Sequence, residues 1–328
     1  MKTRLIAILT MFVAVVILVA ACKKDENAQS NSNNNVQLDS KVSQFNSDAN
    51  NYKSESDQVD NDINNSLSSI PAFGRVAQGA AVLSSPLCGV VIDSSQIANK
   101  ILFYNFDGQT PCFSPSRTRS GQIKVQLTSG AHWSDPGSVL TLTYLNFKVT
   151  RLSDNKSIMF NGVKTLTNIN GNDWIGFLLS TTTLKYQERA LNIAVTFDNN
   201  LSATWNVART TEWNYVQATT NPDIPYAHIV FTAQGDTSLN GLANIDSWGV
   251  NRFGENFTTN YTSPVISNTY CGLWRFNSGE LVHRLNNASF TLTLGLDQNG
   301  NPTPYACAYG YKVAWTINGN SNSVILSY

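Results

Sequence analysis

The stretch Leu140-Thr141-Leu142-Thr143-Tyr144-Leu145-Asn146-Phe147-Lys148-Val149 decides the fold class of this chain. Apolar side chains at positions 140, 142 and 144 alternate with threonines, and this period of two places them on one face of a β-strand. The alternation then continues on the opposite parity, at positions 145, 147 and 149. Because one extra residue reverses the faces of a strand, this change of phase predicts a β-bulge near Tyr144-Leu145.

The same alternation recurs along most of the chain. It is found in 123–127, 191–197, 201–207, 229–231, 290–296 and 311–317. Turn dipeptides that tolerate positive φ separate such segments, among them Asp107-Gly108, Asn161-Gly162 and Asn299-Gly300. No long helical pattern follows residue 75. We therefore expect a mainly β body over 73–328, built as an antiparallel β-sandwich or an elongated two-layer sheet.

A weak internal repeat divides this body. Cys88-Gly89 and Cys271-Gly272 are each followed by a strand pattern, a turn, a second cysteine and a further strand pattern. The order and spacing of these features predict two related β modules, at about 85–215 and 225–328.

A helical pattern precedes the β body. Apolar residues between Leu38 and Ile70 recur at steps of three and four, which predicts one amphipathic helix over 37–72, ending near Pro71. Two roles stay open for it: packing on its own β body by the apolar face, or serving as a stalk or self-association surface. Its acidic residues are interpreted as a solvated face. They are Asp48, Glu55, Asp57, Asp60 and Asp62.

The N-terminus has the plan of an export signal. Lys2 and Arg4 precede an uncharged apolar run that ends at Cys22, which predicts a signal peptide over 1–21. The segment Leu18–Cys22 resembles a bacterial lipobox, and this implies that Cys22 is acylated and becomes the first residue of the mature chain. Its acyl chains would hold the protein on a membrane. The polar residues that follow predict a flexible tether, so that 22–36 comprises the lipidated cysteine and the tether.

A short charged motif directly after Cys22 gives an indication of where the protein is located in the cell. Lys23-Lys24-Asp25-Glu26 resembles the export signal of Bacteroidetes surface lipoproteins, which implies the cell surface. An outer-membrane lipoprotein that faces the periplasm is the alternative. The run Arg117–Val125 and the turns Asn161-Gly162 and Thr167-Asn168 extend the resemblance to a set of Bacteroidetes outer-membrane or surface lipoproteins with a β-rich body. No activity is known for that set, so the resemblance implies anchoring and exposure and transfers no site residue.

The cysteine count fits an exported protein. Of five cysteines, one is the lipidation candidate Cys22, and the remaining four form an even set that predicts two disulfides. Three pairings are formally open. We favour Cys88 with Cys112 and Cys271 with Cys307, because each pair brackets a similar stretch of sequence.

The composition argues against some classes of function but does not identify one. The 328 residues carry 22 basic and 22 acidic side chains, and only 13% are charged, which argues against nucleic acid as a partner. Three scattered histidines and the absence of a Cys-x-x-Cys pair predict no metal site and no cofactor. Neither a phosphate loop nor a nucleophile elbow occurs, so no catalytic residue is assigned.

Tryptophans near polar residues are the best candidates for ligand contact. Low charge, abundant amides and aromatic rings in loops suit hydrogen bonding to and stacking on a glycan, so we expect a binding or cell-surface structural protein with a glycan or protein ligand. The candidates are Trp133, Trp174, Trp213 and Trp248. One alternative is a glycan-active hydrolase, whose acids would come from Asp173, Glu188, Glu212, Asp246, Glu255 and Glu280. Another is an adhesive or scaffold protein that self-associates through its N-terminal helix.

Overall fold

The computed structural model describes residues 33–68, 70–74, 87–112, 116–180, 183–217, 227–273, 275–286, 288–303, 307–317 and 319–328. The expected leader at 1–21, the lipidation candidate Cys22 and the tether up to residue 32 lie outside these ranges. No helix in the described ranges is both long and apolar enough to cross a membrane.

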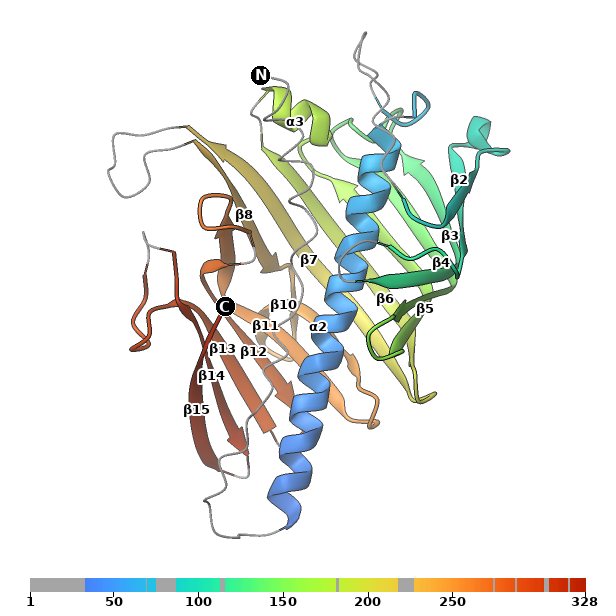
Figure 1. The fold of residues 1–328 in the computed structure, drawn as a ribbon. Helices are drawn as coiled ribbons and strands as arrows, with labels where there is room; N and C mark the ends of the chain where they lie inside the picture. Colours follow the sequence, from blue (N-terminus) through green and yellow to red (C-terminus); the bar gives the residue numbers. More distant parts are fainter. Residues whose placement is uncertain are drawn as a thin grey trace.

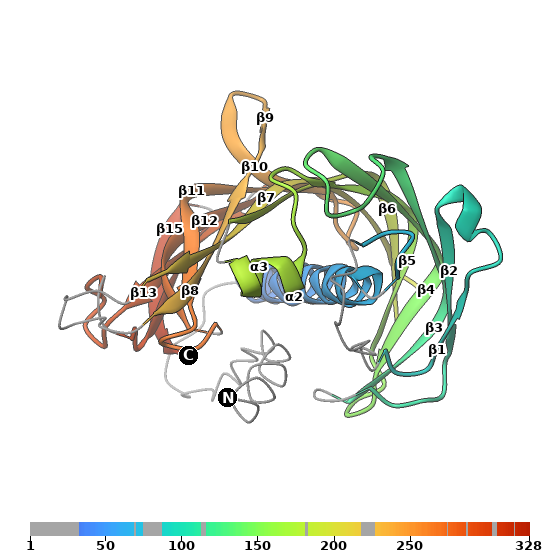
Figure 2. The same cartoon turned by 90° about the horizontal axis from the view of Figure 1, so that it is seen from above.

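A single antiparallel sheet curves around one long helix, so the prediction of a mainly β body preceded by a helix is confirmed (Figures 1 and 2). The long helix is α2 (Asn33–Ser68), and a second helix, α3 (Trp174–Ser180), covers one end of it. The strands are β1 (Val90–Asp93), β2 (Ile101–Asp107), β3 (Arg117–Ser129), β4 (Ser138–Arg151), β5 (Ser157–Asn168), β6 (Leu184–Phe197), β7 (Ser202–Val216), β8 (His228–Gly235), β9 (Thr237–Leu239), β10 (Leu242–Val250), β11 (Asn256–Asn268), β12 (Phe276–Leu285), β13 (Ala288–Leu296), β14 (Gly310–Ile317) and β15 (Asn320–Ser327).

Most strands pair with their neighbours in sequence, and one excursion interrupts this order. β8 and β10 both lie between β7 and β11, end to end, with Gly235 of β8 opposite Arg209 and Ser247 of β10 opposite Val207. The intervening residues form the β9–β10 hairpin, which projects from the outward side of the sheet (Figure 2). The proposed modules at 85–215 and 225–328 stay a prediction.

The curvature of the sheet has a local cause in bulges. Pairing of β4 with β5 shifts between Tyr144 and Phe147, which confirms the predicted bulge, and Asn146 within it has a φ of 52°. A Cβ on Gly121 of the neighbouring strand would lie 2.1 Å from the Asn146 carbonyl oxygen, so only glycine fits there. Asn192 of β6, also left-handed, marks a second bulge. Bulges increase strand bending and twist, which lets the sheet wrap the helix.

The helix packs into the concave side of the sheet by its apolar stripe. Phe45, Tyr52, Val59, Ile63 and Leu67 are all buried. The ring of Tyr52 stacks on Trp205 of β7 with centroids 4.8 Å apart. The first of the two roles left open for the helix is therefore the one observed. Its apolar stripe is covered by the protein's own sheet, as burial must stabilise a helix so rich in Asn, Ser and Asp.

The helix bounds differ slightly from the predicted 37–72. The helix begins at Asn33, because one more turn adds a hydrogen bond per residue to an existing helix. It ends at Ser68, before Pro71, whose ring disfavours helical backbone at the preceding residue. Residues 70–74 then form a turn in which Ile70 O accepts hydrogen bonds from the amides of Phe73 and Gly74.

Both predicted disulfides are present. Cys88 pairs with Cys112 at the β1 end of the sheet, and Cys271 pairs with Cys307 between the β11–β12 and β13–β14 connections. Each disulfide joins the segment before a pair of neighbouring strands to the segment after it: β1 and β2 for the first bond, β12 and β13 for the second.

Candidate functional site

The acidic residues of α2 form ion pairs with the sheet, so the expectation of a solvated acidic face is wrong. The physical reason is the curvature of the sheet around the helix (Figure 2), because it brings strands with basic residues close to the helix on more than one side. The side chain of Asp48 is only 4% exposed and lies 2.6 Å from Arg252. The other pairs are Glu55–Arg117, Asp57–Arg209, Asp60–Lys164 and Asp62–Arg119, and Lys41 of the helix pairs with Glu255.

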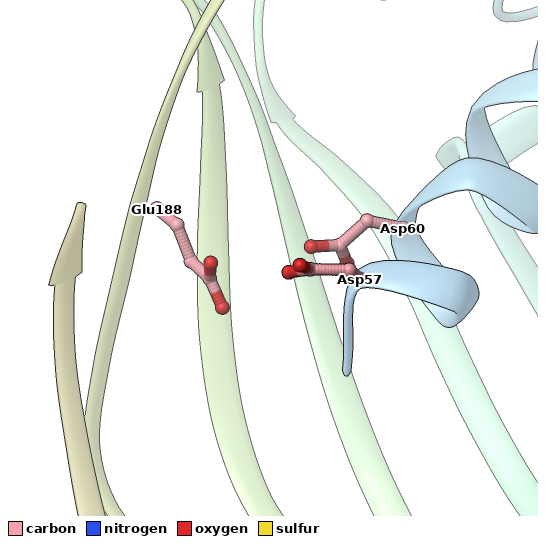
Figure 3. A group of neighbouring side chains, drawn as sticks. All are labelled: Asp57, Asp60 and Glu188. Atoms are coloured by element: carbon pink, nitrogen blue, oxygen red, sulfur yellow. The ribbon is translucent and has the colours of Figure 1, made fainter. Parts of the chain in front are cut away.

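Three carboxylates meet at the middle of this interface. Figure 3 shows Asp57 and Asp60 of the helix facing Glu188 of β6, and their oxygen atoms lie within 4.8 Å of one another. Two buried cations lie among them. Lys164 Nζ is 2.5 Å from Asp60 and 3.5 Å from Glu188. Arg209 donates hydrogen bonds to Asp57, at 2.7 Å, and to Glu188.

The surroundings of the cluster shift the pKa values of Glu188 and Asp60 in opposite directions. Burial opposes ionisation of Glu188, but Arg209 and Lys164 outweigh it and lower the pKa of Glu188 to about 2. Asp60 is desolvated and lies near the negative charges of Glu188 and Asp57, which together outweigh Lys164 and raise its pKa to about 7. Asp60 therefore takes up a proton more readily than an exposed aspartate does, while Glu188 stays ionised between its two buried cations.

The geometry of the cluster suits attachment of the helix to the sheet. Carboxylate oxygens are the donors that hard cations prefer, and Asp57, Asp60 and Glu188 are the described residues that come close enough to share an ion. Lys164 and Arg209 already supply positive charge at hydrogen-bond distance to these oxygens. The cluster therefore joins α2 to β5, β6 and β7 by charge.

Of the six acids considered for a hydrolase, two lie near the same arginine and the other four lie elsewhere. Glu188 and Asp246 both approach Arg209, at hydrogen-bond distance and at 3.9 Å respectively. The other four are engaged locally. Glu212 pairs with Lys185, Glu255 pairs with Lys41, Glu280 accepts hydrogen bonds from Thr262 and Thr293, and Asp173 accepts one from the amide of Gly176.

Three of the four candidate tryptophans contribute to packing, which corrects their expected place at ligand-facing loops. Trp133 is 1% exposed, stacks on Tyr186 and donates a hydrogen bond from Nε1 to Asn64 of the helix at 2.5 Å. Trp174 is 8% exposed and meets Trp213 edge to face, with centroids 4.9 Å apart. Polar neighbours in the sequence misled here, because these rings are packed by residues from distant parts of the chain, such as Tyr186 on Trp133 and Phe231 on Trp213.

Trp248 is different, because it lies on the outward side of the sheet. Its register partner on β7 is Asn206, which stands between Trp205 and Val207. Both of these neighbours belong to the core around the helix, so Asn206 and Trp248 point away from it. Asn206 Nδ2 also donates a hydrogen bond to the Trp248 carbonyl oxygen at 3.0 Å, which fixes the backbone of that residue. Trp248 is half-buried.

A row of outward side chains continues from Trp248 across the neighbouring strands. Successive register partners are Thr258 of β11, Arg284 of β12, Ser289 of β13 and Thr316 of β14. Strands lie about 4.8 Å apart, so the row from β10 to β14 spans about 19 Å. We call these five residues the outward row.

The far end of the outward row opens into a cavity. It has a volume of about 450 Å³ and is open to solvent. Its lining residues are Arg284, Leu285, Asn286, Ala288, Ser289, Thr316 and Gly319. The guanidinium of Arg284 donates a hydrogen bond to Asn260 Oδ1, from the same face of β11. Sequence reasoning missed Arg284 and its neighbours, because only strand register brings them beside Trp248.

Comparisons of the chain with protein-family models, with curated proteins and with solved structures gave no match.

Proposed function

We propose that this chain is an exported lipoprotein, anchored by acylated Cys22 in the outer membrane, whose β body binds an extracellular glycan along the outward row. The anchor places the body at the cell surface. Binding, without a chemical step, is the activity that the arrangement of residues supports.

The observation that carries the proposal is that Trp248 and Arg284 lie on one face of the sheet and that outward residues beside Arg284 line a cavity of about 450 Å³. An aromatic ring offers a stacking face to a sugar, while hydroxyls and a guanidinium exchange hydrogen bonds with sugar oxygens. Thr258, Ser289 and Thr316 supply such hydroxyls between and beyond the two larger side chains. A chain of sugar units that runs across the strands would contact all five residues in turn.

The proposed location at the cell surface is supported by the expected leader, by Cys22 and by the charged motif after it. Mass spectrometry of protein from the membrane fraction should find an acylated Cys22 and no peptide from residues 1–21, whereas an intact leader would contradict this. Protease added to whole cells should remove the β body if it faces outward. Full protection of the β body from the protease would favour the alternative in which the lipoprotein faces the periplasm.

A glycan array tests the binding proposal. The mature acylated chain, purified in detergent, is compared with Trp248→Ala and with Leu191→Ala. The latter is a matched control, because Leu191 is a 67% exposed strand residue outside the outward row. Loss of a stacking aromatic at a binding hot spot should weaken binding by about thirtyfold, and the control should bind as the unchanged chain does.

Thermal unfolding of each variant is measured alongside, so that loss of binding is compared between equally folded proteins. The proposal fails if no glycan on the array is bound, or if the bound glycans are insensitive to Trp248→Ala.

A further inference from the structure

We infer that the cavity at Arg284 receives the carboxylate of an acidic sugar, so that the glycan bound along the outward row is a polyuronate. This inference rests on the proposed function and specifies the ligand class of the same site.

The first supporting observation is how this protein uses arginine. Six arginines of the described residues form ion pairs with carboxylates: Arg117, Arg119, Arg151, Arg189, Arg209 and Arg252. Arg284 differs from them, because within the described parts of the chain no carboxylate lies at ion-pair distance from its guanidinium. No described residue therefore neutralises its positive charge in the way that the charges of the other six are neutralised.

The second observation is the character of the cavity. Of the seven residues that line it, Arg284 is the one with a charged side chain, and none is acidic. The acid on the same face of β12 is Glu280, four residues and thus about 13 Å along the strand. Its carboxylate already accepts hydrogen bonds from Thr262 and Thr293. A ligand in the cavity thus meets positive charge without a competing carboxylate.

The third observation is that the guanidinium is oriented but not saturated. One hydrogen bond, to Asn260 Oδ1, fixes Arg284 on the outward face. A guanidinium carries five N–H donors, so a planar fork remains for a second acceptor. Carboxylates match that fork with two parallel hydrogen bonds, which a neutral hydroxyl cannot do. Ser289 and Thr316 at the adjacent register positions would then contact the hydroxyls of the same sugar.

The test compares polyuronates with their own neutral forms. Polygalacturonate, alginate and hyaluronate are each titrated calorimetrically against the mature acylated chain, beside the same polymers after carboxyl reduction. At least one polyuronate should bind about tenfold or more tightly than its reduced form, because a charge-assisted pair of hydrogen bonds is lost on reduction. Dextran sulfate, compared with dextran, tests whether any anion suffices.

Three variants assign the effect to Arg284. Arg284→Gln should abolish the preference for the acidic form, and Arg284→Lys should keep part of it, because an ammonium retains the charge but not the fork. Arg151→Gln is the matched control, since Arg151 is a half-exposed arginine already paired with Asp154. It should keep the full preference. Melting temperatures verify that each variant is folded.

The outcomes separate this inference from the proposed function. Equal binding of acidic and reduced polymers, still dependent on Trp248, would overturn the inference and leave glycan binding in place. Preference that survives Arg284→Gln, or equal binding of dextran sulfate, would also overturn it. Absence of binding to every polymer, acidic or neutral, would remove both.

Discussion

Trp248 and Arg284 point to the same outward side of the sheet, because Thr258 of β11 is the register partner of both. A bulge creates this relationship. β10 advances from Ile245 to Ser247 while β11 advances by one residue, from Asn260 to Thr259. Without the extra residue, the alternation of faces would turn Trp248 toward the helix. The site thus depends on an irregularity in the strand and on the pairing of three strands.

The helix–sheet core should be highly sensitive to truncation of Phe45. This ring is 0% exposed and lies 4.9 Å from Phe257 and 6.2 Å from Trp205, centroid to centroid. Phe45→Ala should lower the free energy of unfolding by about 3–5 kcal/mol, from lost burial and the cavity left behind. Thermal and denaturant unfolding measure this cost. Ser47→Ala, at an exposed position of the same helix, should change stability by less than about 0.5 kcal/mol.

Arg209 and Glu188 should be energetically coupled. Arg209→Met removes one of two buried cations from Glu188, which keeps Lys164, and leaves Asp57 with the half-exposed Lys53. This should cost about 3–5 kcal/mol, whereas adding Glu188→Gln should recover part of that loss. A double-mutant cycle in denaturant should give a coupling of about 2 kcal/mol. The half-exposed pair Arg151–Asp154 serves as the reference and should couple by less than about 1 kcal/mol. Equal coupling in both pairs would contradict the view that burial strengthens the pair of Arg209 and Glu188.

Asp60 should make stability fall as the pH rises toward neutrality. Its pKa is about 7 in the folded protein, above the value of about 4 in an unfolded chain. An acid with a raised pKa contributes its stability below the unfolded value and loses it as the pH rises through the folded one. Asp60→Asn cannot ionise, so its stability relative to the unchanged chain should increase between pH 5 and 8, by about 2 kcal/mol.

The control for the pH series is an aspartate whose pKa is lowered, not raised. Asp154 has a lowered pKa, because Arg151 donates hydrogen bonds to it, so it stays ionised across this range. The stability difference between Asp154→Asn and the unchanged chain should therefore stay constant from pH 5 to 8. A constant difference for Asp60→Asn as well would refute the raised pKa of Asp60.

The disulfides should contribute comparably, because they close loops of similar length. Cys88 and Cys112 are 24 residues apart, and Cys271 and Cys307 are 36 apart. Replacing either pair by serines should cost about 3 kcal/mol, by relaxing the restriction on the unfolded chain. Non-reducing peptide mapping verifies the connectivity. A peptide that joins Cys88 to Cys271 would be incompatible with the fold.

Local sequence patterns predicted much of the fold. The alternation at Leu140–Val149 located a strand and its bulge, and the even set of cysteines gave both disulfides. These features depend on neighbours in sequence or on simple parity. The long helix was also found from its period, although its ends differ by four residues on each side from the predicted 37–72.

What depends on distant pairing could not be predicted in the same way. The burial of Asp57 and Asp60 against Lys164 requires knowing that the sheet curves around the helix, and no local pattern states this. Trp133 lies in a polar stretch, yet Asn64 and Tyr186 cover it from far along the chain. Nothing in the local sequence marked Arg284 as a site residue, because it shares a face with Trp248 only through the register of β10, β11 and β12.

A crystal structure of the mature chain with a short oligouronate would show where the polymer binds and which residues contact it. We expect sugar units across β10–β14, with one ring against Trp248 and a carboxylate within hydrogen-bond distance of the Arg284 guanidinium. Soaks with the carboxyl-reduced oligomer at the same concentration should give a lower occupancy of sugar at Arg284. An oligouronate bound elsewhere on the molecule, such as beside Trp174 and Trp213, would rule out binding along the outward row.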